Sequence, residues 1–217
     1  MKGAIWLGCA APVRTIRWLD GALAATAKFE GAVAIAAGEA TWLDLAADRA
    51  TRAGLASVAV PTELSLDYLG WAQVVAAVVR QLGATLIVVD EASRPERFPE
   101  VAALAELLDA AQLTHVVALS PDGELVQATR NSGTGLQRLR VRAPAVIGVR
   151  IAGPAIDEYP TPMPSASMKR LDLAALGLDA NVLGHRALPP RVSQQPRKTI
   201  ERIADHLALH CMPRKGP

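Results

Sequence analysis

The sequence predicts an α/β protein: a parallel sheet flanked by helices, with an added antiparallel ribbon and a C-terminal arm. Residues 1–111 alternate short apolar runs with stretches of helical periodicity, which is typical of a parallel sheet with right-handed crossovers. Residues 112–152 hold shorter strand-like runs separated by turn residues. The prolines that follow exclude a paired strand: Pro154, Pro160, Pro162 and Pro164. We therefore expect an α/β domain with its antiparallel extension at 1–152, and an arm and tail at 153–217.

The first part of the chain reads as alternating strands and helices. Apolar runs predict buried strands at 3–9, 32–37, 55–60 and 84–90. Apolar residues at helical spacing predict helices at 39–54, 65–83 and 99–111. Ser65 is a plausible N-cap, Gly83 a stop signal, and Pro99 suits a first helical turn. The run at 84–90 is apolar on both faces, as in a parallel sheet covered by helices.

The second part predicts four short strands, at 113–119, 124–130, 136–142 and 145–151. The segments between them, "SPDG", "NSGTG" and "AP", have turn chemistry, so we expect an antiparallel ribbon grafted onto the α/β layer. After residue 152 nothing resembles core until 198–210, where a terminal helix is expected.

Composition excludes several classes of protein. Hydrophobic residues make up 51% and charged residues 20% of the 217 residues, which indicates a globular chain. The net charge of +2 gives no indication of nucleic-acid binding, and no apolar run is long enough for membrane insertion. The first apolar stretch is too short for a signal peptide, and Cys9 and Cys211 lie far apart in the sequence. We expect a cytoplasmic protein without a disulfide framework or zinc site.

Side chains suited to catalysis or metal binding form no convincing set. There is no nucleophile elbow, Walker-type loop or paired-cysteine motif. His206 and His210 are four residues apart in the predicted terminal helix, a spacing compatible with a metal. Asp205 and Cys211 lie beside them, but few such pairs have a third ligand, so a polar helix end is the better interpretation, and we expect no metal site.

The loop at 90–99, "DEASRPERFP", follows a predicted parallel strand, where open α/β sheets bind ligands. Arg94 and Arg97 precede a predicted helix N-terminus and are suited to holding phosphate. In the alternative interpretation, Asp90, Glu91 and Glu96 neutralise these arginines in a solvated loop. The charge balance slightly favours the second interpretation.

The arm offers the strongest signal outside the core. Its prolines stiffen the backbone and lower the entropy cost of docking, and Met163 between them would be an adaptable apolar anchor. The alternative is a proline-rich segment that packs on its own domain.

Several segments together resemble one known family. They are "APAVIGVRI" (143–151), "EYPTPMPSASMKR" (158–170), "LGLD" (176–179) and "PPR" (189–191). In this order they resemble the beta subunit of electron transfer flavoproteins, as do "LSLDYLGWAQVVAAVV" and "GATLIVV" upstream. The resemblance implies an adenine nucleotide alpha hydrolase-like fold and a heterodimer. An alpha subunit would carry most of the FAD site, and the beta chain would accept electrons from a flavin-dependent dehydrogenase without catalysing bond chemistry.

The resemblance also implies roles for individual residues. In the family the arm recognises partner dehydrogenases, and Met163 falls at the anchor position with Pro164 after it and Met168 and Lys169 close by. Residues 171–217 would wrap along the alpha subunit. Cofactor contacts are expected at the ends of the first two strands and in the loop at 90–99, at Leu7, Gly8, Ala37, Gly38, Arg94 and Arg97.

The sequence departs from the family in the AMP pocket. An acidic run followed by Gln-Thr-Gly is replaced by "RPERFPEVAA", Gly-Ala-Asp-Arg by "GLAS" (54–57), and Lys-Arg after the first strand by "GC" (8–9). The Asn-Pro-aromatic-acidic segment before the second strand is missing. Unpaired phosphate oxygens would be costly to bury, so we expect AMP to be absent or weakly held in a shortened, divergent beta subunit.

One other class of function remains open. The eroded pocket is also compatible with a stand-alone adenine-nucleotide-binding or scaffold module that has lost electron transfer. A hydrolase on the same kind of fold ranks last, because the sequence contains no nucleophile set.

Overall fold

A computed structural model describes residues 1–8, 16–64, 66–92, 98–153 and 168–184. The strands are β1 (Gly3–Trp6), β2 (Val33–Gly38), β3 (Ala56–Pro61), β4 (Leu86–Asp90), β5 (Ala111–Asp122), β6 (Leu125–Asn131), β7 (Leu136–Arg142), β8 (Ala145–Val149) and β9 (Lys169–Arg170). The helices are α1 (Ile16–Thr26), α2 (Ala40–Arg52), α3 (Tyr68–Leu82), α4 (Phe98–Leu107) and the 3₁₀ turn η4 (Ala180–Val182).

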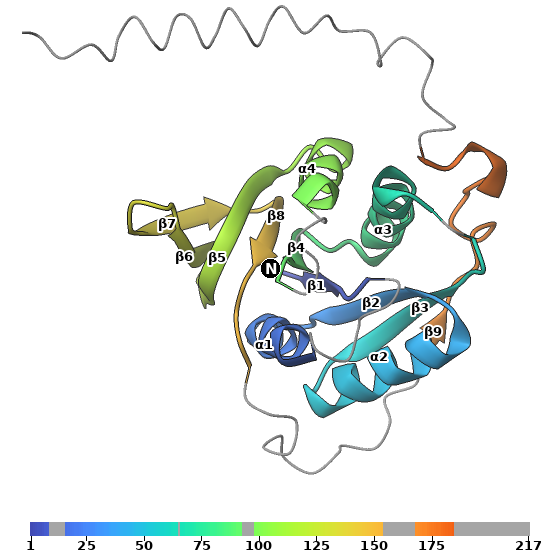
Figure 1. Cartoon of the computed structure of the whole chain (residues 1–217), viewed down its shortest axis with the longest axis horizontal. Helices are drawn as coiled ribbons and strands as arrows, with labels where there is room; N and C mark the ends of the chain where they lie inside the picture. Colours follow the sequence, from blue (N-terminus) through green and yellow to red (C-terminus); the bar gives the residue numbers. More distant parts are fainter. Residues whose placement is uncertain (9–15, 65, 93–97, 154–167, 185–217) are drawn as a thin grey trace, which may run out of the picture. The chain divides into compact units, whose positions relative to one another are not determined.

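The strands form one mostly parallel sheet in the order β7-β6-β5-β8-β4-β1-β2-β3-β9 (Figure 1). Only the β5–β6 and β6–β7 pairs of the described residues are antiparallel. The predicted α/β fold with a parallel sheet and an antiparallel extension is therefore confirmed.

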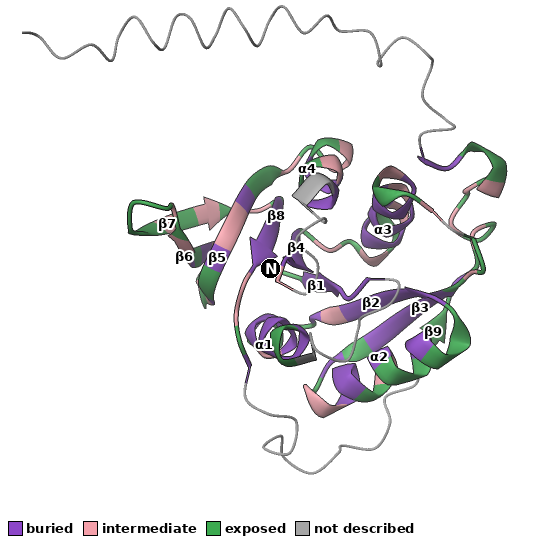
Figure 2. Cartoon of the chain, in the orientation of Figure 1, coloured by how far each residue is buried: buried purple, intermediate pink, exposed green. Residues whose placement is uncertain are grey.

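Helices cover both faces of the parallel sheet, so alternate strand residues enter two separate cores (Figure 2). Ile5 of β1 joins the core beneath α1 and α2, whereas its neighbours Ala4 and Trp6 join the core beneath α3 and α4. Burial on both faces explains why the central strands are continuously apolar rather than alternating.

The position of β8 corrects the predicted topology. Residues 145–151 were expected to close the antiparallel ribbon, but Ala145–Val149 lies between β4 and β5 and is parallel to both. All five residues of β8 are buried. A run that is apolar on both faces belongs inside a covered parallel sheet, and the short "AP" segment before it is not a hairpin turn.

Two helices differ from the sequence interpretation: α1 was not expected, and α3 has a different N-cap. α1 is not among the predicted elements, because buried Asp20 interrupts its apolar pattern; the Asp20 carboxylate pairs with the guanidinium of Arg49 from α2 at 2.7 Å. The N-cap of α3 is Asp67 rather than Ser65, and its carboxylate accepts the N–H of Gly70 at 2.8 Å. Gly83 ends α3 in a left-handed conformation, as predicted.

The segment after the arm packs on the α/β unit. Leu171 and Leu183 are buried in the core beneath α3 and α4, and the N–H of Gly184 donates to the side chain of Gln73 in α3. The expectation that nothing joins the core between residue 152 and the terminal helix is therefore wrong. The described residues up to Gly184 belong to one compact unit. The assignment of 153–217 to partner recognition stays a prediction.

Candidate functional site

The topology marks one place on the sheet as a ligand site. From β1 the chain moves outward through β2 to β3, and then returns through α3 to β4 on the other side of β1. Open α/β sheets bind ligands outside the carboxyl ends of the strands at such a reversal. The candidate site is therefore the sheet edge after β1 and β4, called the switch point below.

The structure brings together the residues predicted at the ends of β1 and β2. The N–H of Leu7 donates to the carbonyl of Ile35, and the N–H of Ala37 lies 3.5 Å from the carbonyl of Gly8. That carbonyl also accepts the indole N–H of Trp42, from α2, at 2.7 Å. The backbone φ angles of Gly8 and Gly38 are 87° and 126°, values that residues other than glycine rarely adopt. A role of these residues in cofactor contact stays a prediction.

The carboxyl end of β4 carries two buried acids. Asp90 is 2% exposed, and its carboxylate accepts the N–H of Ala92. Glu91 is fully buried, and its Oε2 accepts the backbone N–H of His115 at 3.0 Å. Burial raises the pKa of Glu91, an effect opposed by the His115 N–H and the charge of Arg150. The expectation of a solvated loop acid at 91 is therefore wrong.

A missing side chain on β8 makes room for the Glu91 carboxyl group. A Cβ atom at Gly148 would overlap Oε1 of Glu91. This Oε1 is buried and has no hydrogen-bond partner among the described residues. Arg150 lies on the other side of the carboxylate, with its Nε 3.7 Å from Oε2. Glu91 is thus a buried, incompletely satisfied acid held in a space that only glycine leaves open.

A third carboxylate approaches β1 from α4. Glu100, in the first turn of α4, is 7% exposed, and its Oε2 accepts the indole N–H of Trp6 at 3.3 Å. The Trp6 ring lies 6.0 Å from the ring of Trp71 in α3. A helix N-terminus of this kind favours a negative group, and here the chain supplies its own carboxylate.

The remaining predicted residues fall into two groups. Arg94, Arg97, Met163 and Pro164 lie outside the described residues, as do His206 and His210. Met168 is half-buried against the core beneath α1 and α2, and Lys169 is exposed in β9, which pairs with β3.

The described residues contain no group of three or more His, Cys, Asp or Glu side chains placed to hold a metal ion. None of their helices is both long and apolar enough to cross a bilayer.

Comparison with known proteins identifies the family. No curated protein matches the chain. The family model described as "Electron transfer flavoprotein domain" matches residues 19–176, which spans α1 to the segment after β9 and most of the sheet. This match covers well over half of the 217 residues. The chain belongs to the electron transfer flavoprotein family.

Proposed function

We propose that the chain is a beta-type subunit that pairs with an FAD-bearing alpha-type subunit and accepts electrons from a partner dehydrogenase. The observation that carries the proposal is the family match, combined with the arm sequence "EYPTPMPSASMKR", which begins after β8 and ends with the two residues of β9. By its resemblance to the beta subunits, we assign dehydrogenase recognition to this arm, at Met163 and Pro164. The role is electron transfer rather than bond chemistry.

Proteins of this family generally bind flavin, and the charges at the switch point bear on which subunit holds it. A dinucleotide needs donors or cations for its pyrophosphate. The described residues that follow β1 and β4 are Leu7, Gly8, Glu91 and Ala92, and Asp90 ends β4; all five are apolar or acidic. These residues do not fit a pyrophosphate. We infer that the FAD is held mainly by the alpha-type subunit and that this chain buttresses it.

The same acids weaken the case for AMP. Asp90 and Glu91 end β4, and Glu100 occupies the first turn of α4. A phosphate placed here would meet negative charge in a region of low solvent access, where repulsion is stronger than in water. We infer that AMP is held weakly or not at all.

Co-expression with an alpha-type subunit tests the proposed function. We expect the two chains to copurify as a yellow complex with flavin absorbance, and a flavin-dependent dehydrogenase with its substrate to bleach that absorbance. If the chain instead purifies alone and colourless, and binds adenine nucleotide, the proposal is wrong and the stand-alone nucleotide-binding module takes its place.

A further inference from the structure

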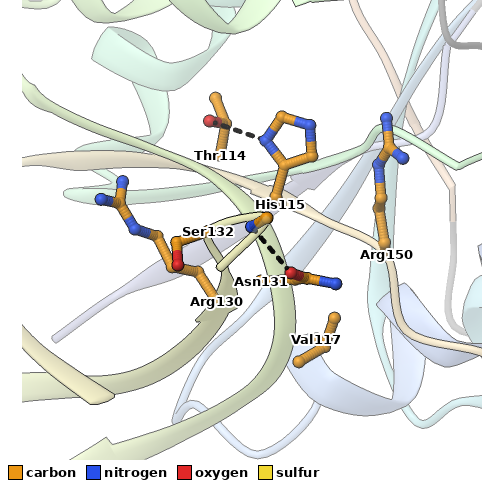
Figure 3. A pocket seen from close by; sticks show the side chains of 8 residues that line it. Thr114, His115, Val117, Arg130, Asn131, Ser132 and Arg150 are labelled. Carbon is orange, nitrogen blue, oxygen red and sulfur yellow. Dashed lines mark hydrogen bonds between the residues drawn. The ribbon is translucent and has the colours of Figure 1, made fainter. Parts of the chain in front are cut away.

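Two basic features lie on the ribbon formed by β5, β6 and β7. The first is a pocket on β5, β6 and the end of β8, whose lining includes Arg130 and Arg150 (Figure 3). The pairing of β5 with β8 shifts register at a bulge, and the N–H of His115 in this bulge donates to the buried carboxylate of Glu91. Arg150 lies beside the same carboxylate. These contacts make the pocket part of the packing around Glu91, whereas the second feature, on β7, is independent of it.

The strand β7 forms one edge of the sheet. In the strand order of the described residues it pairs with β6 alone, so the backbone groups on its outer side meet no further strand. An edge of this kind is a template on which another extended segment can pair. The arm sequence ends in β9, at the opposite edge of the sheet, so the β7 edge is a separate surface.

Arginines occupy alternate positions of β7 and therefore share one face of the strand. They are Arg138, Arg140 and Arg142, and all three are exposed. The residues between them, Leu139 and Val141, pack against the core beneath α1 and α2. The arginine row is therefore on the outward face of the ribbon.

One arginine of the row has an acidic partner among the described residues. The Nε of Arg140 lies 2.8 Å from a carboxylate oxygen of Asp122, at the end of β5. Arg138 and Arg142 form no ion pair with a described residue. The row thus carries positive charge that the described residues leave uncompensated, and the Arg140–Asp122 pair shows that a carboxylate can bind on this face.

An exposed leucine stands at the start of the row. Leu136 is 71% exposed, and its position two residues before Arg138 places it on the same face. Protein interfaces are enriched in arginine and contain apolar contacts, whereas surfaces that bind single-stranded nucleic acid use aromatic side chains for stacking. The net charge of +2 also gives no indication of nucleic-acid binding. These features favour a protein partner.

We propose that β7 docks an extended acidic segment of a partner protein, which adds to the sheet as a further strand. The backbone of this segment would pair with the outer edge of β7, and its carboxylates, at alternate positions, would face the arginine row. A second copy of this chain does not fit, because pairing β7 with itself would place arginines opposite arginines. The inference adds a partner surface to the proposed electron transfer and does not depend on it.

Calorimetric titration of the full-length chain with blocked synthetic peptides tests the proposal. The probe alternates glutamate and threonine between terminal leucines; one control peptide has glutamine for each glutamate, and another has the same composition with its glutamates in one block. We expect saturable binding that is tightest for the alternating acidic peptide. Arg138→Gln and Arg142→Gln should each weaken it by about threefold, as expected for exposed ion pairs. Lys28→Gln, which removes an exposed cation between α1 and β2, is the matched control and should bind like the wild type.

Two further measurements separate strand addition from general charge attraction. The double variant Arg138→Glu/Arg142→Glu should prefer a lysine–threonine peptide to the glutamate–threonine peptide. Amide hydrogen exchange in β7 should slow when the acidic peptide is bound to the wild type.

The proposal is overturned if no peptide binds saturably, in which case the arginines only protect the edge from pairing. It is also overturned if the three peptides bind equally, if Lys28→Gln loses as much affinity as the β7 variants, or if the β7 amides gain no protection. Binding of duplex DNA in place of the peptide, with the same dependence on Arg138 and Arg142, would assign the surface to nucleic acid and contradict the proposal.

Discussion

Two neighbouring parts of the same sheet differ in charge and in exposure. At the switch point the described polar side chains are acids, Asp90, Glu91 and Glu100, and all three are buried. In the pocket on β5, β6 and β8 the charged side chains are Arg130 and Arg150, which are partly exposed. Among the described side chains, the position that the topology marks for a ligand therefore carries acids rather than cations.

Glu91 connects the two regions and explains their difference. Its carboxylate ends the acidic region, yet one oxygen fixes the bulge that presents His115, and Arg150 lies beside it. The structure thus uses an acid at the switch point to position the basic pocket. Topology locates an edge where binding is favoured, and the side chains on that edge decide the chemistry of the ligand.

Filling the space at Gly148 should give the largest effect on stability. In Gly148→Ala the new Cβ would overlap the Glu91 carboxyl group, which must move and lose its hydrogen bond to His115. We expect unfolding free energy to fall by about 3 kcal/mol, measured by urea denaturation.

A second substitution tests the cause of that loss. In a Glu91→Ala background the carboxyl group is gone, so Gly148→Ala should cost clearly less than it does in the wild type. Equal costs in both backgrounds would show that the space at Gly148 does not serve Glu91.

Two methionines near the arm can be compared in the same way: Met168 packs against the core, and Met163 is proposed to contact the dehydrogenase. Met163→Ala should weaken docking of the dehydrogenase by roughly thirtyfold, about 2 kcal/mol, as interface anchors commonly do. Flavin content and melting temperature should stay close to wild type. Dehydrogenase-dependent flavin reduction should slow at limiting dehydrogenase and recover at high concentration.

Met168 is the matched control, because its side chain is half-buried against the core beneath α1 and α2. Met168→Ala should lower thermal stability and leave reduction per flavin unchanged. The recognition role of the arm is wrong if Met163→Ala melts the complex or bleaches its flavin while reduction per flavin persists.

The raised pKa of Glu91 gives a pH dependence with a definite sign. Between its ordinary pKa of 4.5 and the raised value, the folded state binds more protons than the unfolded state. The contribution of Glu91 to the free energy of unfolding is therefore fully present below pH 4.5, and it is lost as the pH rises through the raised pKa of the folded state. Glu91→Gln removes the titration and keeps an acceptor for the His115 N–H. The pKa of Asp20 is also raised by burial, but its contribution cancels in the difference between the two proteins.

Urea denaturation of wild type and Glu91→Gln across this pH range is the measurement. We expect the wild type to lose stability relative to the variant as pH rises from 4.5. A difference that is flat, or that grows in the opposite direction, would contradict burial as the dominant influence on the Glu91 carboxyl group.

Nucleotide content should show the smallest effect. Acid extraction of the purified complex should release less than stoichiometric AMP. Glu100→Gln keeps an acceptor for the Trp6 indole and removes one negative charge, so AMP affinity should rise by about fivefold at most. Stoichiometric AMP in the wild-type complex would show that the acids of the switch point do not prevent phosphate binding.

The sequence predicts the elements that depend on local patterns. β2, β3 and β4 form as predicted, because each is a continuous apolar run bounded by turn residues. The placement of β8 needed pairing information, since "AVIGV" alone does not say which strands flank it. Residues 171–184 were missed because their leucines are scattered, and only contact with α3 and α4 makes them core.

The site was predictable to a smaller extent. The carboxyl ends of β1, β2 and β4 follow from strand order, so Gly8, Gly38 and the loop after β4 were the natural candidates. The burial of Glu91 could not be predicted from the sequence. It depends on the lack of a side chain at Gly148, which is distant in the sequence, and on the backbone N–H of His115. No spacing rule connects these residues, which meet only when β4, β5 and β8 align.

Flavin reduction in the assembled protein tests the central claim most directly. The chain is purified with an alpha-type subunit, and flavin absorbance is followed after adding a flavin-dependent dehydrogenase and its substrate, with the alpha-type subunit alone as control. The account predicts a stable two-chain complex whose flavin is bleached only when this chain is present. A flavin reduced equally well by the alpha-type subunit alone, or a chain that never joins it, would contradict the proposed role.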